Sequence, residues 1–453
     1  MKTFDLIVIG AGSGLNVASA AAEKGMKIAI VEKGPMGGTC LNRGCIPSKI
    51  IIHSADVAET ISNSKKFGIN SKISSVDFKK ITSRASNIVD KEAKEIEEGI
   101  LESKNIILFN KESKFVAERT LQVGRETIKG DKVVIAAGTR ASIPPVEGLK
   151  DVNFMTSDEA LRLRKQPKVM TILGGGYIAA ELAHFYGALG TKINIIQRNK
   201  LLLPNEDEEI AKKFTEIFSK KYNVLLEYDA VKVEKKKNKF IVTAKGKSSS
   251  KKLISDALLV AAGRIPNSYT LDLAKTNVKV NDKGFIVTDD FLETTAPNIW
   301  AFGDIAGKYL FKHSANLEAQ YVFNNAVLNQ KIKVDYTAMP HAIFSSPQIA
   351  GVGMTEKQLI DNKIRYAKGV YKYIKSGMGQ ALQDTEGFVK IMADKQTRKI
   401  LGCYILGTDA STLIHEVVVA MKNNLTVDAI KDSVHIHPAL SEVVQRAVNG
   451  IEW

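Results

Sequence analysis

One local pattern occurs twice in this chain of 453 residues and restricts the folds open to it. It consists of an apolar run, a glycine-rich turn, a helical stretch and a second apolar run. The first copy occupies residues 4–31 and the second occupies residues 169–196. The runs are apolar without polar alternation, which is typical of strands buried on both faces of a parallel sheet. Each copy is therefore predicted to form a strand–helix–strand unit.

A second repeat indicates two related domains. Residues 133–140 read VVIAAGTR and residues 258–264 read LLVAAGR, so each is an apolar strand that runs into Ala-Ala-Gly. Internal repeats of this kind indicate duplicated structural units. The chain is therefore predicted to be an α/β protein with two Rossmann-like dinucleotide-binding domains. From about residue 336 no glycine fingerprint follows, and mixed strands and helices predict an α+β C-terminal domain.

The expected domain boundaries follow from these units. The Pro144–Pro145 pair marks the passage from the first domain to the second. A charged stretch over residues 82–103 predicts an exposed helix within the first domain. The four expected segments of the chain are 1–145, 146–265, 266–335 and 336–453.

Composition and charge exclude several classes of protein. With 44% apolar and 25% charged residues, the chain is typical of globular proteins. It has no apolar run of about 18 residues and no secretion signal, so we expect a cytoplasmic protein without a membrane span. The net charge of +15 comes largely from lysine runs such as residues 235–239 and 247–252. Because no stacking aromatics accompany these runs, they favour a solvated lysine-rich hairpin over nucleic-acid binding.

The first glycine turn has the features of an adenine-dinucleotide site. Gly10, Gly12 and Gly14 let the backbone approach a pyrophosphate, which binds the N–H groups at the start of the helix. Leu15 stands where the usual fingerprint has its last glycine. Glu32, at the end of the second strand, can accept hydrogen bonds from a ribose. The turn is therefore predicted to bind an adenine dinucleotide.

The second glycine turn fits the fingerprint closely, and the residues after it bear on the choice of nicotinamide cofactor. Gln197 stands where a carboxylate would favour an unphosphorylated ribose, and Arg198 and Lys200 supply cations nearby. Because a cation accommodates a 2′-phosphate, the sequence slightly favours NADP(H) over NAD(H). The residues of the turn expected to contact the nucleotide are Gly174, Gly176, Tyr177 and Ile178.

Two of the three cysteines, Cys40 and Cys45, are separated by four residues, and a tight loop of that length can bring their sulfur atoms within bonding distance. Pro47 suits the first turn of a helix, so Cys45 is expected near the positive end of that helix, which favours a thiolate. Lys49 lies on the same helical face and adds positive charge. A zinc site would need more ligands than His53 supplies. The pair is therefore predicted to be redox-active, with no metal site.

Five motifs, which together extend over the chain, resemble those of the class I pyridine nucleotide-disulfide oxidoreductases. They are GGTCLNRGCIPSK at 37–49, GGGYIAAE at 174–181, AAGRIPN at 261–267, IWAFGDIAG at 299–307 and HIHPALSE at 435–442. The resemblance implies bound FAD and a homodimer whose active site is shared across the interface. It also implies an FAD-binding domain at 1–145, an NAD(P)-binding domain at 146–265, a second FAD-binding or central part at 266–335, and a dimerisation domain at 336–453.

The resemblance also assigns roles to individual residues. Cys40 is similar to the thiol that attacks substrate, and Cys45 is similar to the thiol nearest the flavin, which forms a charge-transfer thiolate. Lys49 and Glu181 resemble the ion pair beside the flavin and nicotinamide. Asp304 resembles the residue that holds the ribityl chain. Further cofactor contacts are implied for Gly38, Thr39, Ala137, Gly138, Gly263, Arg264 and Gly303.

His437 and Glu442 resemble an acid–base dyad that reaches across from the partner subunit. Thiol–disulfide exchange needs a base that takes a proton from one thiol and returns it to a departing thiolate, and histidine titrates in the right range. Glu442 can orient the imidazole. His435 is the competing candidate, but the motif match and the restriction that Pro438 places on the preceding residue favour His437. The sequence leaves open whether the His437–Pro438 bond is cis.

Within the family, two activities fit the sequence. CIPSK and HPALSE resemble dihydrolipoyl dehydrogenase, the leading assignment, in which dihydrolipoamide reduces the Cys40–Cys45 disulfide and electrons pass through FAD to NAD(P)+. NADPH-dependent reduction of a small-thiol disulfide, as in mycothione reductase, is the alternative. The segments closer to mycothione reductase are GAGSGLN at 10–16, AAELAHFYGALGT at 179–191, QRNKLLLPNEDEEI at 197–210 and HSANLEA at 313–319. The expected partner is a small dithiol or disulfide substrate, or the lipoyl domain of a 2-oxoacid dehydrogenase complex.

Other activities are disfavoured. Mercuric reductase has a C-terminal cysteine pair, whereas the last cysteine here is Cys403. The glutathione reductase pattern has lysine and arginine where this chain has Ser48 and Pro204. A flavin- or nucleotide-binding protein without turnover is the remaining alternative.

Overall fold

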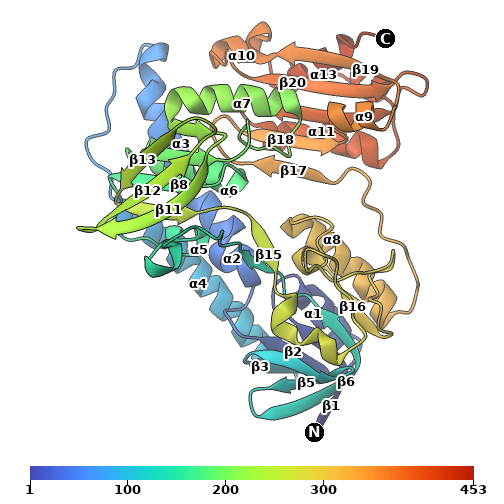
Figure 1. The fold of residues 1–453 in the computed structure, drawn as a ribbon. Helices are drawn as coiled ribbons and strands as arrows, with labels where there is room; N and C mark the ends of the chain where they lie inside the picture. The colour runs from blue at the N-terminus through green and yellow to red at the C-terminus, as the bar shows by residue number, and fades with distance from the viewer.

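The computed structural model describes residues 1–453, and apart from β16 (Ile299–Ala301), which joins the first sheet, its three largest sheets follow one another along the chain (Figure 1). The first sheet lies near the N-terminus at the bottom of Figure 1, the second lies at the upper left and the third at the upper right. The predicted fold class, with two Rossmann-like domains and an α+β C-terminal domain, is confirmed. None of the helices combines the length and apolar character required to cross a membrane.

The first sheet has the strand order β3-β2-β1-β6-β5-β4, and β16 also pairs with β6. The apolar run of β1 is buried on both faces, as its lack of alternation predicts. Because β16 follows the second sheet in the chain, the backbone returns to the first sheet there. The strands are β1 (Lys2–Ile9), β2 (Ile28–Glu32), β3 (Ile106–Asn110), β4 (Ser113–Ala117), β5 (Thr120–Val123), β6 (Glu126–Ile135) and β16 (Ile299–Ala301), and the accompanying helices are α1 (Gly14–Glu23) and α8 (Lys312–Val322).

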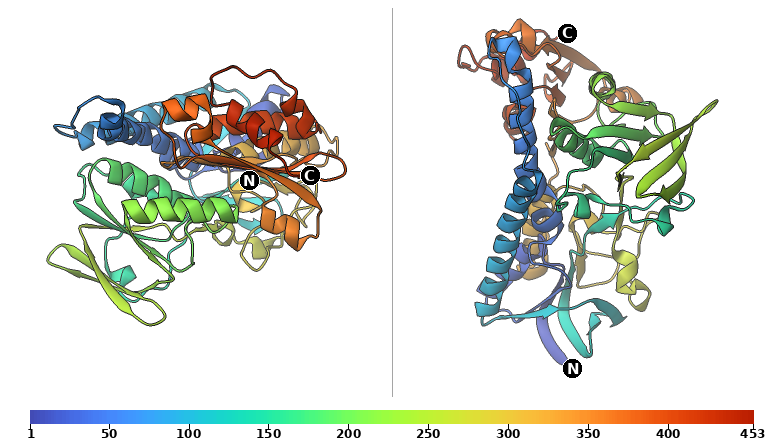
Figure 2. Two further views of the ribbon diagram at one scale, coloured as in Figure 1. Left: turned by 90° about the horizontal axis from the view of Figure 1, so that it is seen from above. Right: turned by 90° about the vertical axis from the view of Figure 1, so that its left-hand side faces the viewer.

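Three helices, α2 (Gly38–Arg43), α3 (Cys45–Asn63) and α4 (Phe78–Glu102), precede β3, and α3 and α4 extend along one side of the molecule (Figure 2). The prediction that residues 82–103 form an exposed helix is wrong in one respect. Apolar and small residues recur at helical spacing on one face of α4, so that face is buried. Val89 and Ala93 on it pack against Leu41 of α2.

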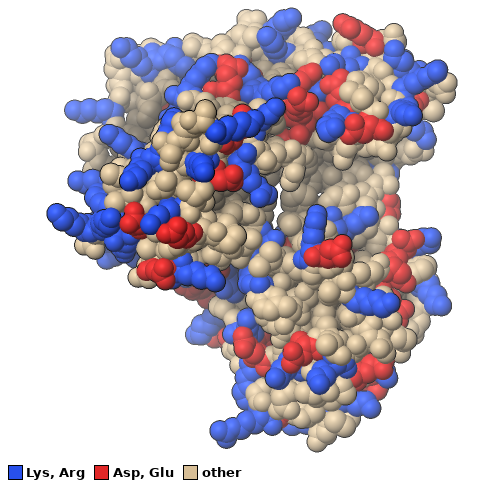
Figure 3. Space-filling view, viewed as in Figure 1, with Lys and Arg blue, Asp and Glu red and all other residues tan.

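The second sheet is wholly parallel, with the order β10-β9-β8-β14, and it carries α6 (Tyr177–Ala188) and α7 (Glu208–Lys221). Its strands are β8 (Val169–Leu173), β9 (Lys192–Gln197), β10 (Asn223–Leu226) and β14 (Ala257–Val260). The lysine runs lie on a separate antiparallel sheet of β11 (Asp229–Lys236), β12 (Lys239–Lys245) and β13 (Ser250–Ser255). Lysine and arginine side chains gather on this side of the molecule, at the left of Figure 3. The expected hairpin therefore has a third strand.

The third sheet is antiparallel throughout, with the order β17-β18-β21-β20-β19. Helices α11, α12 and α13 cover it and share its apolar core. A short ladder of β7 (Thr139–Ala141) and β15 (Arg264–Pro266) connects the two dinucleotide-binding parts. The remaining bounds are β17 (Pro340–Ile343), β18 (Ile349–Gly353), β19 (Tyr366–Lys372), β20 (Phe388–Asp394), β21 (Ile400–Leu406), α5 (Ser157–Ala160), α9 (Glu356–Asp361), α10 (Gly377–Ala381), α11 (Ala410–Lys422), α12 (Val427–Lys431) and α13 (Glu442–Asn449).

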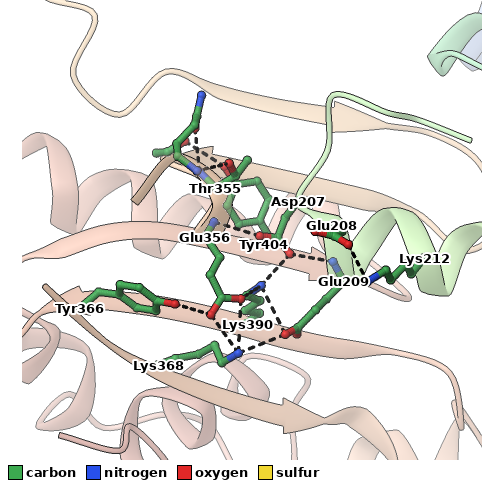
Figure 4. A network of polar contacts seen from close by, with 12 residues as sticks. Asp207, Glu208, Glu209, Lys212, Thr355, Glu356, Tyr366, Lys368, Lys390 and Tyr404 are labelled. Carbon is green, nitrogen blue, oxygen red and sulfur yellow. Dashed lines mark hydrogen bonds and ion pairs between the residues drawn. The ribbon is translucent and has the colours of Figure 1, made fainter. Parts of the chain in front are cut away.

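A buried ion network joins the second sheet's helix α7 to the third sheet (Figure 4). The ammonium group of Lys390, on β20, lies 2.8 Å from Asp207 and 2.6 Å from Glu356. The side chains of Lys390 and Asp207 are 1% and 0% exposed. Asp207 also caps α7 through the N–H of Glu209 and accepts a hydrogen bond from the N–H of Glu356. The network therefore fixes the position of the second domain against the C-terminal domain.

Candidate active site

The first glycine turn has the close approaches that a dinucleotide-binding turn requires. Gly10 has φ of 104°, and a Cβ atom there would lie 2.3 Å from the carbonyl oxygen of Ala136. A Cβ atom on Gly14 would lie 2.9 Å from Val8 of β1. Gly14 thus allows the close helix–strand packing usually given by the last glycine of the fingerprint. This explains why the chain tolerates Leu15.

The pocket beside this turn can hold the adenosine half of a dinucleotide. A cavity of about 450 Å³ lies where β1 and β2 end, and Gly10, Glu32 and Ala137 are among its lining residues. The Glu32 carboxylate accepts hydrogen bonds from the N–H groups of Ala11 and Gly34, each at 2.8 Å. It therefore orders the turn and lies at the cavity wall, where a ribose could reach it. The cavity, the Glu32 carboxylate at its wall and the close backbone approach at the glycines together fit the adenosine half of FAD.

The second glycine turn repeats the geometry of the first. Gly174 has φ of 112°, and a Cβ atom there would lie 2.3 Å from the carbonyl oxygen of Ala261. A Cβ atom on Gly176 would meet nothing within 4 Å, so the backbone there borders open space. Tyr177 and Ile178 begin α6 directly after it. The turn can therefore present N–H groups at a helix N-terminus to a pyrophosphate.

Gln197, which the sequence predicts to contact the nucleotide, is the last residue of β9 and lies beside the second glycine turn. Its side chain is buried, its amide donates to the carbonyl of Leu201 at 3.3 Å, and it packs under Gly175. Gln197 therefore supports the glycine turn from below. Arg198, the next residue, is exposed.

The two cysteines lie on successive helices, where a tight loop was expected. Cys40 is in α2 and Cys45 is the first residue of α3, with only Gly44 outside a helix between them. A Cβ atom on Gly44 would lie 2.9 Å from the carbonyl oxygen of Thr39, so the close return of the chain needs glycine. Gly38 and Thr39 begin α2. Both thiols are free in this structure.

The two thiols differ in acidity. A hydrogen bond from Cys40 and the nearby ammonium group of Lys49 lower the pKa of Cys45 to about 7, although burial opposes this. The same hydrogen bond to Cys45, together with burial, raises the pKa of Cys40. Cys45 therefore ionises first, and Cys40 needs a base to become a nucleophile.

Lys49 and Glu181 form an ion pair next to the cysteines. The ammonium group of Lys49 lies 2.9 and 2.8 Å from the two carboxylate oxygens of Glu181, which is buried. The N–H of Phe344 donates to the same carboxylate at 3.0 Å, and Lys49 lies over the Phe344 ring. Since Lys49 is on α3 and Glu181 is on α6, the pair joins the two dinucleotide-binding parts beside Cys45.

Asp304 lies near the same region, in a short helical turn after Gly303. Its carboxylate accepts a hydrogen bond from the Thr139 hydroxyl at 2.8 Å, and burial raises its pKa. Arg264 donates to the hydroxyl and carbonyl of Thr139 at 2.7 and 2.8 Å. A Cβ atom on Gly138 or Gly263 would meet nothing within 4 Å. These strand ends therefore border space that cofactors can occupy.

The His437–Glu442 pair is on the C-terminal domain. The Nδ1 atom of His437 lies 3.1 Å from Glu442, and this hydrogen bond lowers the pKa of Glu442. The imidazole is 74% exposed, and the His437–Pro438 bond is cis. Within one chain no hydrogen bond or ion pair links His437 to either cysteine. His435 forms a separate pair with Glu416 at 3.0 Å and is largely buried.

Sequence reasoning missed two residues at the site. Lys312, the first residue of α8, donates to Ser13 in the first glycine turn, and Phe344 anchors Glu181 through its N–H. Neither belongs to a local motif. They reach the site through contacts between residues far apart in the chain, so the sequence carried no signal for them.

Comparison with known proteins agrees with this geometry. Residues 4–339 match the family described as pyridine nucleotide-disulphide oxidoreductase, and residues 339–448 match its dimerisation domain, which indicates a homodimer. Mycothione reductase of Mycobacterium tuberculosis (strain H37Rv) is 34% identical over 466 residues and covers 100% of both chains. Dihydrolipoyl dehydrogenase of Bacillus subtilis (strain 168) is 31% identical and covers 98% of this chain and 95% of its own.

A solved structure with the same architecture is the Cu(II) complex of the HOCl-induced flavoprotein disulfide reductase RclA from Escherichia coli. It superposes with a TM-score of 0.89 at 27% identity and covers 99% of each chain. The paired thiols, the two glycine turns and the full-length matches agree. This chain therefore belongs to the pyridine nucleotide-disulphide oxidoreductase family, as an NAD(P)-dependent flavoprotein disulfide oxidoreductase.

Proposed function

We propose that this protein uses NADPH to reduce the disulfide of a small thiol compound through FAD and the Cys40–Cys45 pair. The observation that carries this proposal is the charge where β9 ends. Gln197 is neutral and buried there, and the exposed cation Arg198 follows it. A cation at this position, with no carboxylate beside it, favours the 2′-phosphate on the adenosine ribose of NADPH. The full-length similarity to mycothione reductase supports the same direction of electron flow.

Dihydrolipoyl dehydrogenase, the leading assignment from the sequence, becomes the second candidate here because position 197 lacks the carboxylate that favours NAD(H). The CIPSK and HPALSE segments favour it, as does the 31% identity with the Bacillus subtilis enzyme. In that activity the same path runs in reverse, from dihydrolipoamide or a lipoyl domain to NAD(P)+. The two candidates share every proposed catalytic residue and differ in substrate and cofactor.

The proposed chemistry starts at Cys40. Its thiolate attacks one sulfur of the substrate disulfide RSSR, which forms a Cys40–SR bond and releases RS−. The Cys45 thiolate then attacks the sulfur of Cys40, which releases a second RS− and leaves a Cys40–Cys45 disulfide. Bound FAD, when reduced by NADPH, supplies the two electrons that open this disulfide again. We assign the proton transfers to His437 and Glu442 of the partner subunit.

The cofactor contacts and domain limits are part of the same proposal. FAD is assigned to residues 1–145 and 266–335, NADPH to 146–265, and the dimer contact to 336–453. Lys49 and Glu181 position the flavin and nicotinamide against each other. The residues proposed to hold FAD are Gly10, Gly12, Gly14, Glu32, Gly38, Thr39, Ala137, Gly138, Gly303 and Asp304. Those proposed to hold NADPH are Gly174, Gly176, Tyr177, Ile178, Arg198, Gly263 and Arg264.

The pKa of Cys45 predicts how reduced holoenzyme responds to pH. Because its pKa is lowered to about 7, the Cys45 thiolate forms as pH rises through that value and disappears below it. Long-wavelength charge-transfer absorbance should therefore rise with a midpoint near pH 7. The Cys45→Ser variant should lack this absorbance at every pH. A midpoint near the ordinary thiol pKa would contradict the assignment of Cys45 as the flavin-side thiol.

The assignment of His437 to the partner's active site can be tested by mixing inactive chains. His437→Gln should lower turnover by about 100-fold or more, because the general base is lost. A heterodimer of Cys40→Ser and His437→Gln chains has one site with both residues intact, so it should recover about half of wild-type activity per dimer. If Cys40 and His437 acted within one chain, purified heterodimers would show no recovery.

A substrate panel tests the proposed function itself. Initial rates are compared for NADPH and NADH with mycothiol disulfide, glutathione disulfide and lipoamide, and for NAD+ and NADP+ with dihydrolipoamide. We expect the highest kcat/KM with NADPH and a small-thiol disulfide. Highest kcat/KM with NAD+ and dihydrolipoamide would establish the second candidate, and no turnover with any pair would reject both.

A further inference from the structure

Two polar pairs connect α3 with α6. Lys49 and Glu181 form the first pair, beside the cysteines. In the second pair, the Nε2 atom of His184 on α6 lies 2.8 Å from the carboxylate of Asp56 on α3. Lys49 and Asp56 are seven residues apart, about two helical turns, so they share one face of α3. Glu181 and His184 are three residues apart and likewise share one face of α6. The two pairs therefore join the same two helix faces at two levels.

The remaining contact between α3 and α6 is apolar and contains many small side chains. The core that the two helices share includes Ala55 and Ala58 from α3. It also includes Ala179, Ala180 and Ala183 from α6. Apolar contact is non-directional, and short side chains interlock only shallowly. The two polar pairs are therefore the directional contacts that fix the position of α6 along α3.

The burial of His184 is not explained by stability. Its side chain is fully buried, and its Nδ1 atom makes no hydrogen bond within the protein. The Glu59 carboxylate on α3 lies 3.8 Å from Nδ1 and pairs instead with Lys221 on α7. Because the Asp56 side chain is 46% exposed, water can solvate it without His184. A buried polar group with an unmade hydrogen bond carries a desolvation cost, so an apolar residue of similar size should be tolerated at position 184.

We propose that His184 is a positioning residue that acts through Asp56 and holds α6 where NADPH can reduce FAD. This inference rests on the proposed binding of NADPH at the second glycine turn, from which α6 begins. The flavin-side residues Cys45 and Lys49 are on α3. A displacement of α6 along α3 would move the nicotinamide-binding residues relative to the flavin site. A shift of about 1 Å can slow a reaction by up to about 100-fold.

Rapid mixing of the holoenzyme tests this role because it separates the two half-reactions. His184→Leu removes the hydrogen-bond donor and should lower the limiting rate of FAD reduction by NADPH about tenfold, with little change in the affinity for NADPH. Reoxidation of prereduced enzyme by the preferred disulfide should stay near the wild-type rate, because Cys40 and Cys45 are not on α6. His184→Gln carries an amide N–H at the position of Nε2 along the side chain. It keeps the bond to Asp56 and should restore most of the rate.

Two further measurements separate positioning from overall stability. The thermal unfolding midpoint of His184→Leu should stay near that of wild type. In protein without nicotinamide, hydrogen exchange in peptides of α6 should be faster for His184→Leu than for His184→Gln. Asp56→Ala should slow FAD reduction as much as His184→Leu, and the double variant should be no slower, because both changes remove one contact. His53→Leu, which changes an exposed histidine on α3, is the matched control and should leave the rate unchanged.

Three outcomes would overturn the proposal. The first is equal rates of FAD reduction for wild type and His184→Leu. The second is a His184→Gln variant as slow as His184→Leu, and the third is a loss of rate that follows a lower unfolding midpoint. FAD reduction is measured with whichever nicotinamide reduces the wild-type enzyme. A preference for NADH would therefore overturn the proposed function, whereas the comparison of variants would still decide the role of His184.

Discussion

Replacing Cys40 with serine should reduce disulfide turnover by at least about 1000-fold, because a serine hydroxyl neither ionises near neutral pH nor forms a disulfide. FAD should stay bound, since the glycine turns and the Glu32 cavity do not include Cys40. Rates with the preferred disulfide and the FAD absorbance of the purified protein measure the two effects. In a protein that only binds flavin or nucleotide, the substitution would change neither the rate measured with the disulfide nor the FAD absorbance.

The Cys45→Ser variant distinguishes the two thiols. It keeps the attacking Cys40 but lacks the thiol that resolves the mixed disulfide, so Cys40 should remain bonded to one half of the substrate. Intact-protein mass spectrometry should then show one substrate thiol added per chain. Cys403→Ala is the control. Because Cys403 is fully buried in β21, it should form no adduct, and removing it should not change the adduct seen in the Cys45→Ser variant. An adduct on Cys45 in the Cys40→Ser variant would reverse the two assignments.

The parts of the fold that sequence predicted are those with local determinants. The strand–turn–helix units follow from apolar runs and glycines within about 30 residues, and both glycine turns have the expected geometry. The His437–Glu442 contact joins residues five positions apart. For the C-terminal domain the sequence predicted only the α+β fold class. The order of its strands could not be predicted from the hydrophobic pattern of the sequence.

The parts that sequence could not predict depend on contacts between distant segments. The burial of one face of α4 depends on packing against α2 and α3, and the turn of Gln197 toward Leu201 depends on the fit beneath Gly175. Lys312 meets Ser13 across 299 positions. Propensity and motif carry no information on such pairs, which form only when the domains fold together.

The Lys390 network is the largest of these long-range features, and its loss should affect stability more than any surface change. Lys390→Met should lower the free energy of unfolding by about 3–5 kcal/mol, because it leaves the buried Asp207 and the partly buried Glu356 without their cation. Thermal and urea unfolding of the holoenzyme measure this. Lys357→Met is the matched control: its exposed pair with Asp361 lies on α9, and its loss should cost less than about 0.5 kcal/mol.

The acid dependence of stability offers a second readout of the same network. Burial would raise the pKa of Glu356, but hydrogen bonds from Lys390, Tyr366 and Lys368 lower it to about 2. A carboxylate whose folded pKa is depressed stabilises the fold above its unfolded pKa, and this contribution is lost as pH falls toward the folded value. Between about pH 5 and pH 2, wild type should therefore lose stability more steeply than Lys390→Met, which has already lost one of these bonds. Parallel pH profiles, or equal unfolding midpoints for Lys390→Met and Lys357→Met, would show that the network does not hold the second domain against the third sheet.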